Sequence, residues 1–377
     1  MNRKDHLIKI GKPYIEKLVD NYRLSAKVVL QEKEQIMWFE VKEIYGEYLI
    51  SDRGDAFVVA LFMTAMREGA DIECQAPVTR RLLYQINHYL IPMLAANMNG
   101  FHYIKVYAEP TDAVLECANA VGTGWTAGVD CMFTYLQNFN KKYSSYKLTH
   151  LLIANNGAIE GNSFKKTREV LWKMVKKTEE GFAAEEGLKV IGVDTNLQEI
   201  LQENFVAVVG IRHAVVILAL QKLFRIFFDS SSYEFSNFSF NTENIGHYEW
   251  LVLNYFETDN TVFYYSGGAF SRGQKLKALS EFPLAQKYLH PCVFALKENC
   301  GHCGKCIRTQ VALYGLGKLE QFSNVFDVEA FEKDKEWYFE KMLFYERNID
   351  YKEALNLLEQ RGIDLTNIRR RMYEKNI

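Results

Sequence analysis

Residues 116–137 read ECANAVGTGWTAGVDCMFTYLQ, and this stretch decides the fold that the sequence predicts. An apolar run leads into a group of small residues, and a helical pattern follows them at once. The small residues are Gly122, Gly124, Thr126, Ala127 and Gly128. Small residues after a strand let backbone N–H groups approach an anion, and the N-terminus of the next helix adds a partial positive charge. The stretch therefore predicts a phosphate-binding turn between a strand and a helix.

The chain around this stretch repeats the order strand, loop and helix. Segments 113–122, 148–157 and 188–196 predict strands, and 162–187 predicts a charged amphipathic helix. A further, apolar helix is predicted around Val215 to Phe227. Strands that alternate with helices of this length indicate an α/β fold with an open parallel sheet covered on both faces. Such a sheet binds ligands outside the carboxyl ends of its strands, which is where the predicted turn falls.

Three regions follow from the pattern. Residues 1–112 predict a small N-terminal α/β domain, in which 37–50 alternate like a pair of strands around Gly46. Residues 113–290 contain the predicted sheet and the turn. Residues 291–377 contain a cysteine cluster and an amphipathic helical tail, whose aromatic stripe is typical of a core.

Composition narrows the class of protein. The 377 residues include 45 basic and 47 acidic side chains, a net charge of −2 that gives no overall attraction to nucleic acid or to an anionic membrane. The N-terminus lacks the pattern of a signal peptide. The most apolar run, 205–228, contains four Lys, Arg or His side chains that a membrane span would bury at high cost. We expect a cytoplasmic protein with no membrane partner and no clear nucleic-acid partner.

The turn fits neither of two common phosphate-binding motifs. A Walker A loop needs a Lys before its closing Ser or Thr, and GTGWTAGVDC has none. The dinucleotide motif G-x-G-x-x-G fits only if Ala127 is skipped, because Gly128 arrives one residue late. A tight turn that binds nothing is the alternative at this point.

The turn does resemble the Ser-Gly-Gly-x-Asp-Ser loop of the PP-loop ATP pyrophosphatase family, which also follows an apolar strand and opens a helix. In that family the loop holds the pyrophosphate end of ATP while a substrate oxygen attacks the α-phosphate, giving an adenylate. The resemblance assigns six positions, from the first Ser to the last: Thr126, Ala127, Gly128, Val129, Asp130 and Cys131. It implies that these residues, with Gly122 and Gly124, bind ATP. The change of Gly to Ala carries a cost only where the backbone needs a positive φ.

The second motif is a cysteine cluster in HPCVFALKENCGHCGKCIRT. It contains Cys292, Cys300, Cys303 and Cys306. A Cys-x-x-Cys knuckle points two thiolates at one centre, and Gly301 and Gly304 are expected to relieve the backbone strain. Four thiolates satisfy tetrahedral Zn²⁺ and leave no open position, which predicts a structural zinc site. An iron–sulfur cluster and a redox pair are the alternatives.

The cluster and the turn together resemble the 7-cyano-7-deazaguanine synthase family, whose members use ATP and ammonia to turn a carboxylate into an amide and then a nitrile. The resemblance covers residues from about 113 to 310 and assigns 113–290 to a PP-loop ATP-binding domain. It places the segment SRGQKLKALSEFP at a basic helix before the first cysteine. Arg272 and Lys275 in this segment, which the stretch SGGAFSR leads into, are expected to neutralise phosphate charge, and a solvated helix face is the alternative. Arg212 and His213 stand where the family has an Arg-Asn pair, so Arg212 is expected to contact phosphate or substrate. Capping of a buried helix is the alternative role.

These features predict an AMP-forming enzyme in which Mg²⁺ and ATP activate a carboxylate or ring carbonyl of a heterocyclic or other small-molecule acid, and nitrogen then displaces AMP. Asp130, Cys131 and Arg212 are the predicted catalytic residues. ATP-dependent sulfur transfer is the alternative, because a helix N-terminus is expected to lower the pKa of the Cys131 thiol. A second alternative is a non-catalytic nucleotide sensor or assembly protein. A partner that donates ammonia or sulfur, and a homodimer, stay open.

Overall fold

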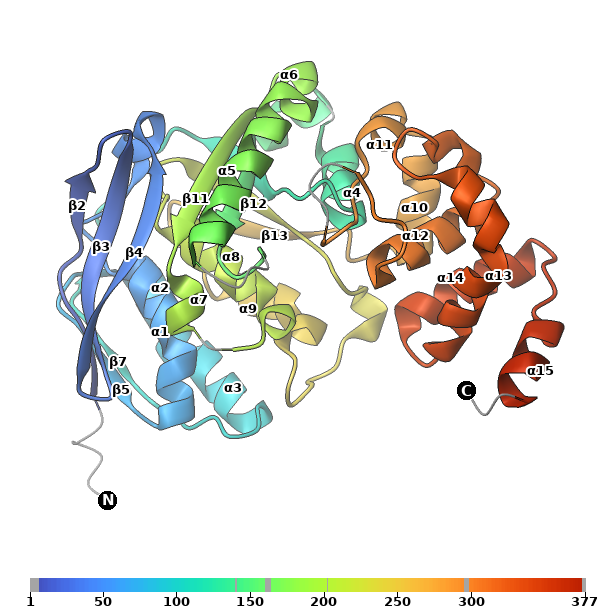
Figure 1. Cartoon of the computed structure of the whole chain (residues 1–377). Helices are drawn as coiled ribbons and strands as arrows, with labels where there is room; N and C mark the ends of the chain where they lie inside the picture. Colours follow the sequence, from blue (N-terminus) through green and yellow to red (C-terminus); the bar gives the residue numbers. More distant parts are fainter. Residues whose placement is uncertain (1–6, 140, 160–163, 202, 295–297, 375–377) are drawn as a thin grey trace. The chain divides into compact units, whose positions relative to one another are not determined.

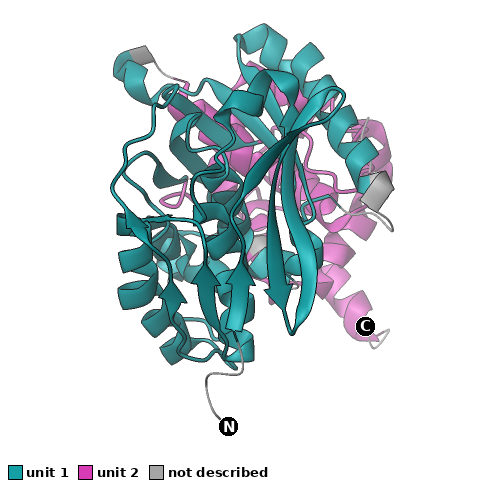
Figure 2. Ribbon diagram, turned by 90° about the vertical axis from the view of Figure 1, so that its left-hand side faces the viewer, with its two compact units in different colours: residues 1–124, 141–266 teal, residues 125–140, 267–377 magenta. Residues whose placement is uncertain are grey.

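The computed structural model describes residues 7–139, 141–159, 164–201, 203–294 and 298–374. The chain forms two compact units, which Figure 2 colours separately. Unit 1 contains residues 1–124 and 141–266, and unit 2 contains residues 125–140 and 267–377. Unit 2 is therefore made of a short internal segment and the whole C-terminal region.

Unit 1 contains a large mixed sheet in which most neighbouring strands are parallel. Its eleven strands, within the described residues, have the order β13-β12-β9-β10-β11-β4-β3-β1-β5-β7, with β2 paired to β3. The strands are β1 (Leu7–Ile10), β2 (Tyr14–Lys17), β3 (Asn21–Leu30), β4 (Lys33–Lys42), β5 (Asp71–Cys74), β7 (Val106–Tyr107), β9 (Ala120–Gly124), β10 (His150–Asn155), β11 (Lys189–Thr195), β12 (Phe224–Ser230) and β13 (Val262–Ser266). A separate parallel pair joins β6 (Val78–Thr79) to β8 (Pro110–Thr111). The α/β prediction is confirmed, with a mixed sheet in place of a purely parallel one.

The strands β9 to β13 form the larger of two parallel parts of this sheet, and β1, β5 and β7 form the other. In the larger part the first strand in the chain, β9, is central, with β10 and β11 on one side and β12 and β13 on the other. The strand order thus reverses between β9 and β12, and open α/β sheets bind ligands outside the carboxyl ends of their strands at such a switch point. The chain leaves β9 at Gly124 and enters the predicted turn directly.

Helices cover both faces of the sheet in unit 1 (Figure 1). A Cβ on Gly192 of β11 would meet Trp172 and Val175 of α5, whereas Ile191 and Val193 belong to the main core. Since successive strand residues point to opposite faces, α5 lies across the sheet from that core. The helices of this unit are α1 (Asp55–Glu68), α2 (Arg80–Gln85), α3 (Ile91–Asn97), α5 (Phe164–Glu180), α6 (Phe182–Glu186), α7 (Leu197–Ile200), α8 (Val209–Leu218) and α9 (Glu249–Asn254).

Three elements of unit 1 differ from the sequence prediction. The strand expected over 113–122 begins only at Ala120 and continues to Gly124 as β9. The apolar helix expected around Val215 to Phe227 ends at Leu218, and its second half is the strand β12. The strand pair expected around Gly46 is β4 followed by a 3₁₀ helix over Glu43–Tyr48. A Cβ on Gly46 would lie 2.3 Å from Cδ2 of Tyr22, so the glycine leaves room for that ring.

Unit 2 is helical, as predicted for the C-terminal region. Its helices are α4 (Val129–Asn138), α10 (Arg272–Ser280), α11 (Pro283–Tyr288), α12 (Gly304–Gly315), α13 (Val328–Phe344), α14 (Ile349–Gln360) and α15 (Thr366–Glu374). α10 packs against α4, α12 and α14, and α12 also packs against α13 and α14. The aromatic stripe of the tail is core, since Phe331, Tyr338 and Phe339 are buried.

None of the helices in the described part of the chain is both long enough and apolar enough to cross a membrane.

Candidate functional site

The predicted turn is shorter than the sequence suggests. Gly122 and Gly124 belong to β9, and residues 125–128 connect β9 to α4. A Cβ on Gly122 would lie 2.4 Å from Cε1 of Phe224, so this glycine is explained by packing. Thr126, Ala127 and Gly128 form the turn itself, whereas Val129, Asp130 and Cys131 form the first turn of α4. The backbone amides available to an anion are thus those around Gly128 and the start of α4.

Ala127 has a φ of +56°, in the left-handed region that favours glycine. This is the position at which the PP-loop family has its first Gly. The turn therefore has a left-handed backbone at a residue that carries a Cβ, at a cost of about 1 kcal/mol.

We expect Ala127→Gly to raise the free energy of unfolding by up to about 1 kcal/mol, because it removes the Cβ from a left-handed backbone. Chemical denaturation measures the change. Ala312→Gly in the interior of α12 is the control, and it should destabilise by about 1 kcal/mol. If Ala127→Gly destabilises the protein as Ala312→Gly does, Ala127 does not have a left-handed backbone that glycine would favour.

Asp130 lies between two cations from α10. Its Oδ1 accepts from Nζ of Lys275 at 3.0 Å, and its Oδ2 accepts from Nη1 of Arg272 at 3.2 Å. Lys275 is buried, and the Asp130 side chain is 28% exposed. Partial burial alone would raise the pKa of Asp130, but Lys275, Arg272 and Arg308 outweigh it and hold that pKa well below its usual range. Asp130 is therefore a carboxylate that orients two cations at the start of α4.

Two further cations, which sequence reasoning missed, belong to the same cluster. Lys305 and Arg308 lie in the first two turns of α12, and the charge of Arg308 acts on Asp130. Partial removal from solvent and the charges of Arg308 and Arg272 lower the pKa of Lys305, although its side chain reaches the surface. The signal was present in the sequence, since Arg272-x-x-Lys275 and Lys305-x-x-Arg308 each put two cations on one face near a helix start.

We call Asp130, Arg272, Lys275, Lys305 and Arg308 the anion site. The four cations and the Asp130 carboxylate lie in the first two turns of α4, α10 and α12, three helices of unit 2 (Figure 1). A second carboxylate, that of Glu353, reaches the start of α10, where it accepts from the hydroxyl of Ser271. The Nε of Arg272 is buried and has no hydrogen-bond partner within the described residues. Four clustered cations, an unused buried donor and helix N-termini suit a multiply charged anion such as a diphosphate.

Cys131 differs from the expectation of a low thiol pKa. Its side chain is buried, and its Sγ donates to the carbonyl oxygen of Gly128 at 3.3 Å. Burial raises the pKa of the Cys131 thiol, and the nearby charge of Asp130 adds to this effect. Desolvation thus outweighs the helix N-terminus, and the thiol stays protonated at neutral pH.

The four predicted metal ligands come together in unit 2. The Sγ atoms of Cys292, Cys300, Cys303 and Cys306 all lie within 4.8 Å of one another. Four sulfurs around tetrahedral zinc, at about 2.3 Å from the metal, are separated by about 3.8 Å, so this arrangement fits the ion with small adjustments. Within the described residues, these four cysteines are the group that could hold a metal ion.

The backbone supports this cluster. The amides of Cys303 and Cys306 donate to the sulfurs of Cys300 and Cys303, at 3.3 and 3.4 Å. Gly301 has a φ of +75°, as a knuckle requires. Gly304 has ordinary backbone angles, but a Cβ there would lie 2.7 Å from the hydroxyl of Tyr351, so packing explains it.

Arg212 lies in unit 1, fully buried on α8. Its Nη1 donates to the carbonyl of Asn156 at 2.7 Å, and its Nη2 donates to the carbonyls of Leu201 and Glu203. Burial lowers the pKa of Arg212 to about 10. These contacts give Arg212 a clear role in fixing the loops that follow β10 and α7, which is the alternative to contact with phosphate.

His213, next to Arg212, forms a polar cluster with two buried acids in unit 1. Its Nδ1 lies 2.5 Å from Oδ1 of Asp229, whose Oδ2 has no hydrogen-bond partner within the described residues. The Oε1 of Glu249 accepts from the amide of Gly210 at 2.5 Å. Burial raises the pKa of Glu249 well above its usual range, and the charge of Asp229 raises it further. Two acids thus share a buried region in which one of them holds a proton.

We expect Glu249→Gln to flatten the pH dependence of stability. A raised pKa means that the contribution of Glu249 is complete below about pH 4, near the unfolded value, and is lost as the pH rises toward the folded value. Wild type should therefore lose stability relative to the variant, by up to about 1.4 kcal/mol per pH unit. Denaturation from pH 4 to 8 measures this, with exposed Glu243→Gln as the control. Parallel curves for wild type and Glu249→Gln would contradict it.

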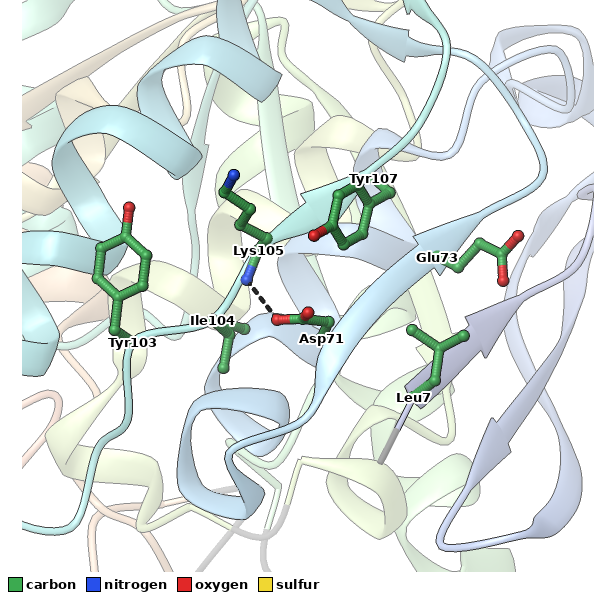
Figure 3. A pocket seen from close by; sticks show the side chains of 7 residues that line it. All are labelled: Leu7, Asp71, Glu73, Tyr103, Ile104, Lys105 and Tyr107. Carbon is green, nitrogen blue, oxygen red and sulfur yellow. Dashed lines mark hydrogen bonds between the residues drawn. The ribbon is translucent and has the colours of Figure 1, made fainter. Parts of the chain in front are cut away.

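A pocket of about 570 Å³ lies elsewhere in unit 1, at the β1, β5 and β7 side of the sheet (Figure 3). Asp71 and Glu73 line it, and Oδ1 of Asp71 accepts from the backbone amide of Lys105 at 2.7 Å. None of the predicted site residues lines this pocket, so it does not bear on the predicted chemistry.

Comparisons of the chain with models of protein families, with curated proteins and with solved structures found no match. The case for a function therefore depends on the residues and the geometry described above.

Proposed function

We propose that the protein is an ATP-dependent, AMP-forming enzyme that activates a carboxylate or ring carbonyl of a small heterocyclic acid for attack by nitrogen. The observation that carries the proposal is the anion site at the start of α4, where Lys275 and Arg272 contact Asp130 and the charges of Arg308 and Lys305 act on it. The resemblance of the turn and of the cysteine spacing to the PP-loop ATP pyrophosphatases, and to the 7-cyano-7-deazaguanine synthase family, supports it.

In the proposed reaction a carboxylate oxygen of the acid attacks the α-phosphorus of ATP, and the bond from that phosphorus to the pyrophosphate oxygen breaks. Arg272, Lys275, Lys305 and Arg308 hold the negative charge that develops on the leaving pyrophosphate, assisted by the amides around Gly128. Ammonia then attacks the activated carbonyl carbon, the bond to AMP breaks, and the nitrogen loses a proton. The products are an amide, AMP and pyrophosphate.

Both oxygens of Asp130 accept from Lys275 and Arg272, so Mg²⁺ would be held mainly by the substrate phosphates and water, as this ion commonly is in such sites. When bound, Mg²⁺ neutralises phosphate charge. Cys292, Cys300, Cys303 and Cys306 are the proposed ligands of a structural Zn²⁺, because four thiolates leave no position for a substrate.

Nitrogen is proposed over sulfur because the Cys131 thiol is buried and its pKa is raised. A sulfur carrier needs an accessible thiolate. Cys131→Ser should therefore leave AMP formation within about threefold of wild type.

The test incubates the protein with ATP, Mg²⁺, ammonium and a panel of heterocyclic carboxylic acids, and follows AMP and pyrophosphate by ³¹P NMR. We expect acid-dependent release of both in equal amounts. Lys275→Met should reduce the rate more than a hundredfold, whereas Lys277→Met, at an exposed position of the same helix, should not. Release of ADP and phosphate would contradict the proposal, and ATP binding without turnover for any acid would favour a nucleotide sensor.

A further inference from the structure

The cysteine cluster and the anion site share one helix. We propose that they are coupled, so that a metal ion on the four cysteines tightens the binding of a diphosphate, and a bound diphosphate slows the loss of the metal. The inference rests on the anion site of the proposed function, and it adds Lys305 and Arg308 as residues whose placement depends on the metal centre. All of the groups involved belong to unit 2.

The first connection is the start of α12. Cys303 is the N-cap residue of this helix, and Cys306 lies in its first turn. Lys305 falls between these two ligands, and Arg308 follows the second by two residues. A metal ion that holds both cysteines therefore fixes the backbone from which the two cations of the anion site project.

The second connection joins the cysteine cluster to the turn itself. The amide of His290 donates to the carbonyl oxygen of Ala127 at 2.7 Å. Cys292 follows two residues later, and its amide donates to Oδ1 of Asn299 at 3.2 Å. The Nδ2 of Asn299 donates to the carbonyl of Leu289 at 3.0 Å. Residues 289–292, which bind the carbonyl of Ala127 and include the first metal ligand, are thus fixed by hydrogen bonds to Asn299.

These two connections give the coupling a definite sign. Without metal, four thiols have no common partner and the first turn of α12 loses its anchor, so two of the four cations are no longer held in place. A tetrathiolate zinc centre also carries two net negative charges, which act against anion binding. We expect ordering to dominate, because the amides of Cys303 and Cys306 already compensate the thiolates. By linkage, the factor by which metal favours the anion equals the factor by which the anion favours metal.

The experiment follows transfer of zinc from the zinc-loaded full-length protein to an excess of a chromogenic chelator, with and without inorganic pyrophosphate. Calorimetry of pyrophosphate binding to the same protein is run in parallel. In wild type, we expect saturating pyrophosphate to slow zinc release about tenfold, within the range usual for coupled sites. In Arg308→Gln the slowing should be lost at equal zinc content. Lys333→Ala, at an exposed position of α13, is the matched control and should behave as wild type.

The outcomes separate the two proposals. Slowing in wild type and Lys333→Ala, but not in Arg308→Gln, supports the coupling. Pyrophosphate that binds with an unchanged or faster zinc release overturns the coupling and leaves the anion site standing. No pyrophosphate binding to the zinc-loaded protein overturns the anion site and the coupling with it. Pyrophosphate can also bind zinc directly. Such extraction would make zinc release from Arg308→Gln faster with pyrophosphate than without it.

Discussion

Asp130→Ala is expected to lower the free energy of unfolding by about 3 kcal/mol and to abolish pyrophosphate formation. The variant removes the Asp130 carboxylate from the buried Lys275 ammonium, and removing one member of a buried ion pair has a cost of this size. Activity is lost because Lys275 and Arg272 are no longer oriented toward the start of α4. Urea denaturation and ³¹P NMR of the reaction measure the two effects.

The double variant Asp130→Ala/Lys275→Met distinguishes the energy of the Asp130–Lys275 ion pair from the other effects of removing Asp130. It should recover part of the lost stability, because the buried ammonium that has lost the Asp130 carboxylate is also removed, but it should not recover activity. The effect also depends on pH in a defined direction. Since the folded pKa of Asp130 is lowered, its contribution is complete above about pH 4 and is lost as the pH falls through the folded value. Additive effects of the two substitutions, or a difference from wild type that persists at the lowest pH, would contradict this account.

Cys306→Ser is expected to remove the metal and to destabilise unit 2 by about 4 kcal/mol, the stabilisation given by a ligand at about a thousand times its Kd. Cys306 is completely buried in the first turn of α12. Water or another solvent ligand therefore cannot reach this position to replace the lost thiolate as the fourth metal ligand. Metal analysis and thermal unfolding measure the two changes.

The control for this experiment is Cys117→Ser. Cys117 is a half-buried cysteine of unit 1, and its Sγ lies 3.6 Å from the carbonyl oxygen of Leu223. This variant should keep the full metal content and the stability of unit 2. Retention of zinc by Cys306→Ser with unchanged stability would show that the four cysteines do not form a structural site.

Much of the fold could be predicted from local pattern. The alternation of strands and helices predicted the α/β class, and the small residues after β9 predicted a strand-to-helix turn. The sequence did not reveal the strand β12, because α8 and β12 lie in one apolar run and most residues of both are buried. Periodicity cannot separate a buried helix from a buried strand in such a run. The antiparallel pairing of β4 with β11, which extends the sheet with N-terminal strands, is a long-range contact that no local signal reveals.

The candidate site divides in the same way. Cysteine spacing was sufficient to predict the four-thiol cluster, because the knuckle is a local structure. Arg272 and Lys275 were expected to neutralise phosphate charge, but their contacts with Asp130 were not predicted, and Lys305 and Arg308 were missed. Which faces of α10 and α12 meet is decided by packing in unit 2, so only a folded structure shows that all four cations share one place. The Cys131 thiol was misjudged because a helix N-terminus is visible in the sequence, whereas burial is not.

The most direct test of the central claim is a crystal structure of the protein with Mg²⁺ and α,β-methylene-ATP, an analogue whose pyrophosphate cannot leave. The account predicts that the β- and γ-phosphates contact the amides around Gly128 and the side chains of Arg272, Lys275 and Arg308. A triphosphate bound at any other place, with the turn between β9 and α4 free of ligand, would contradict it.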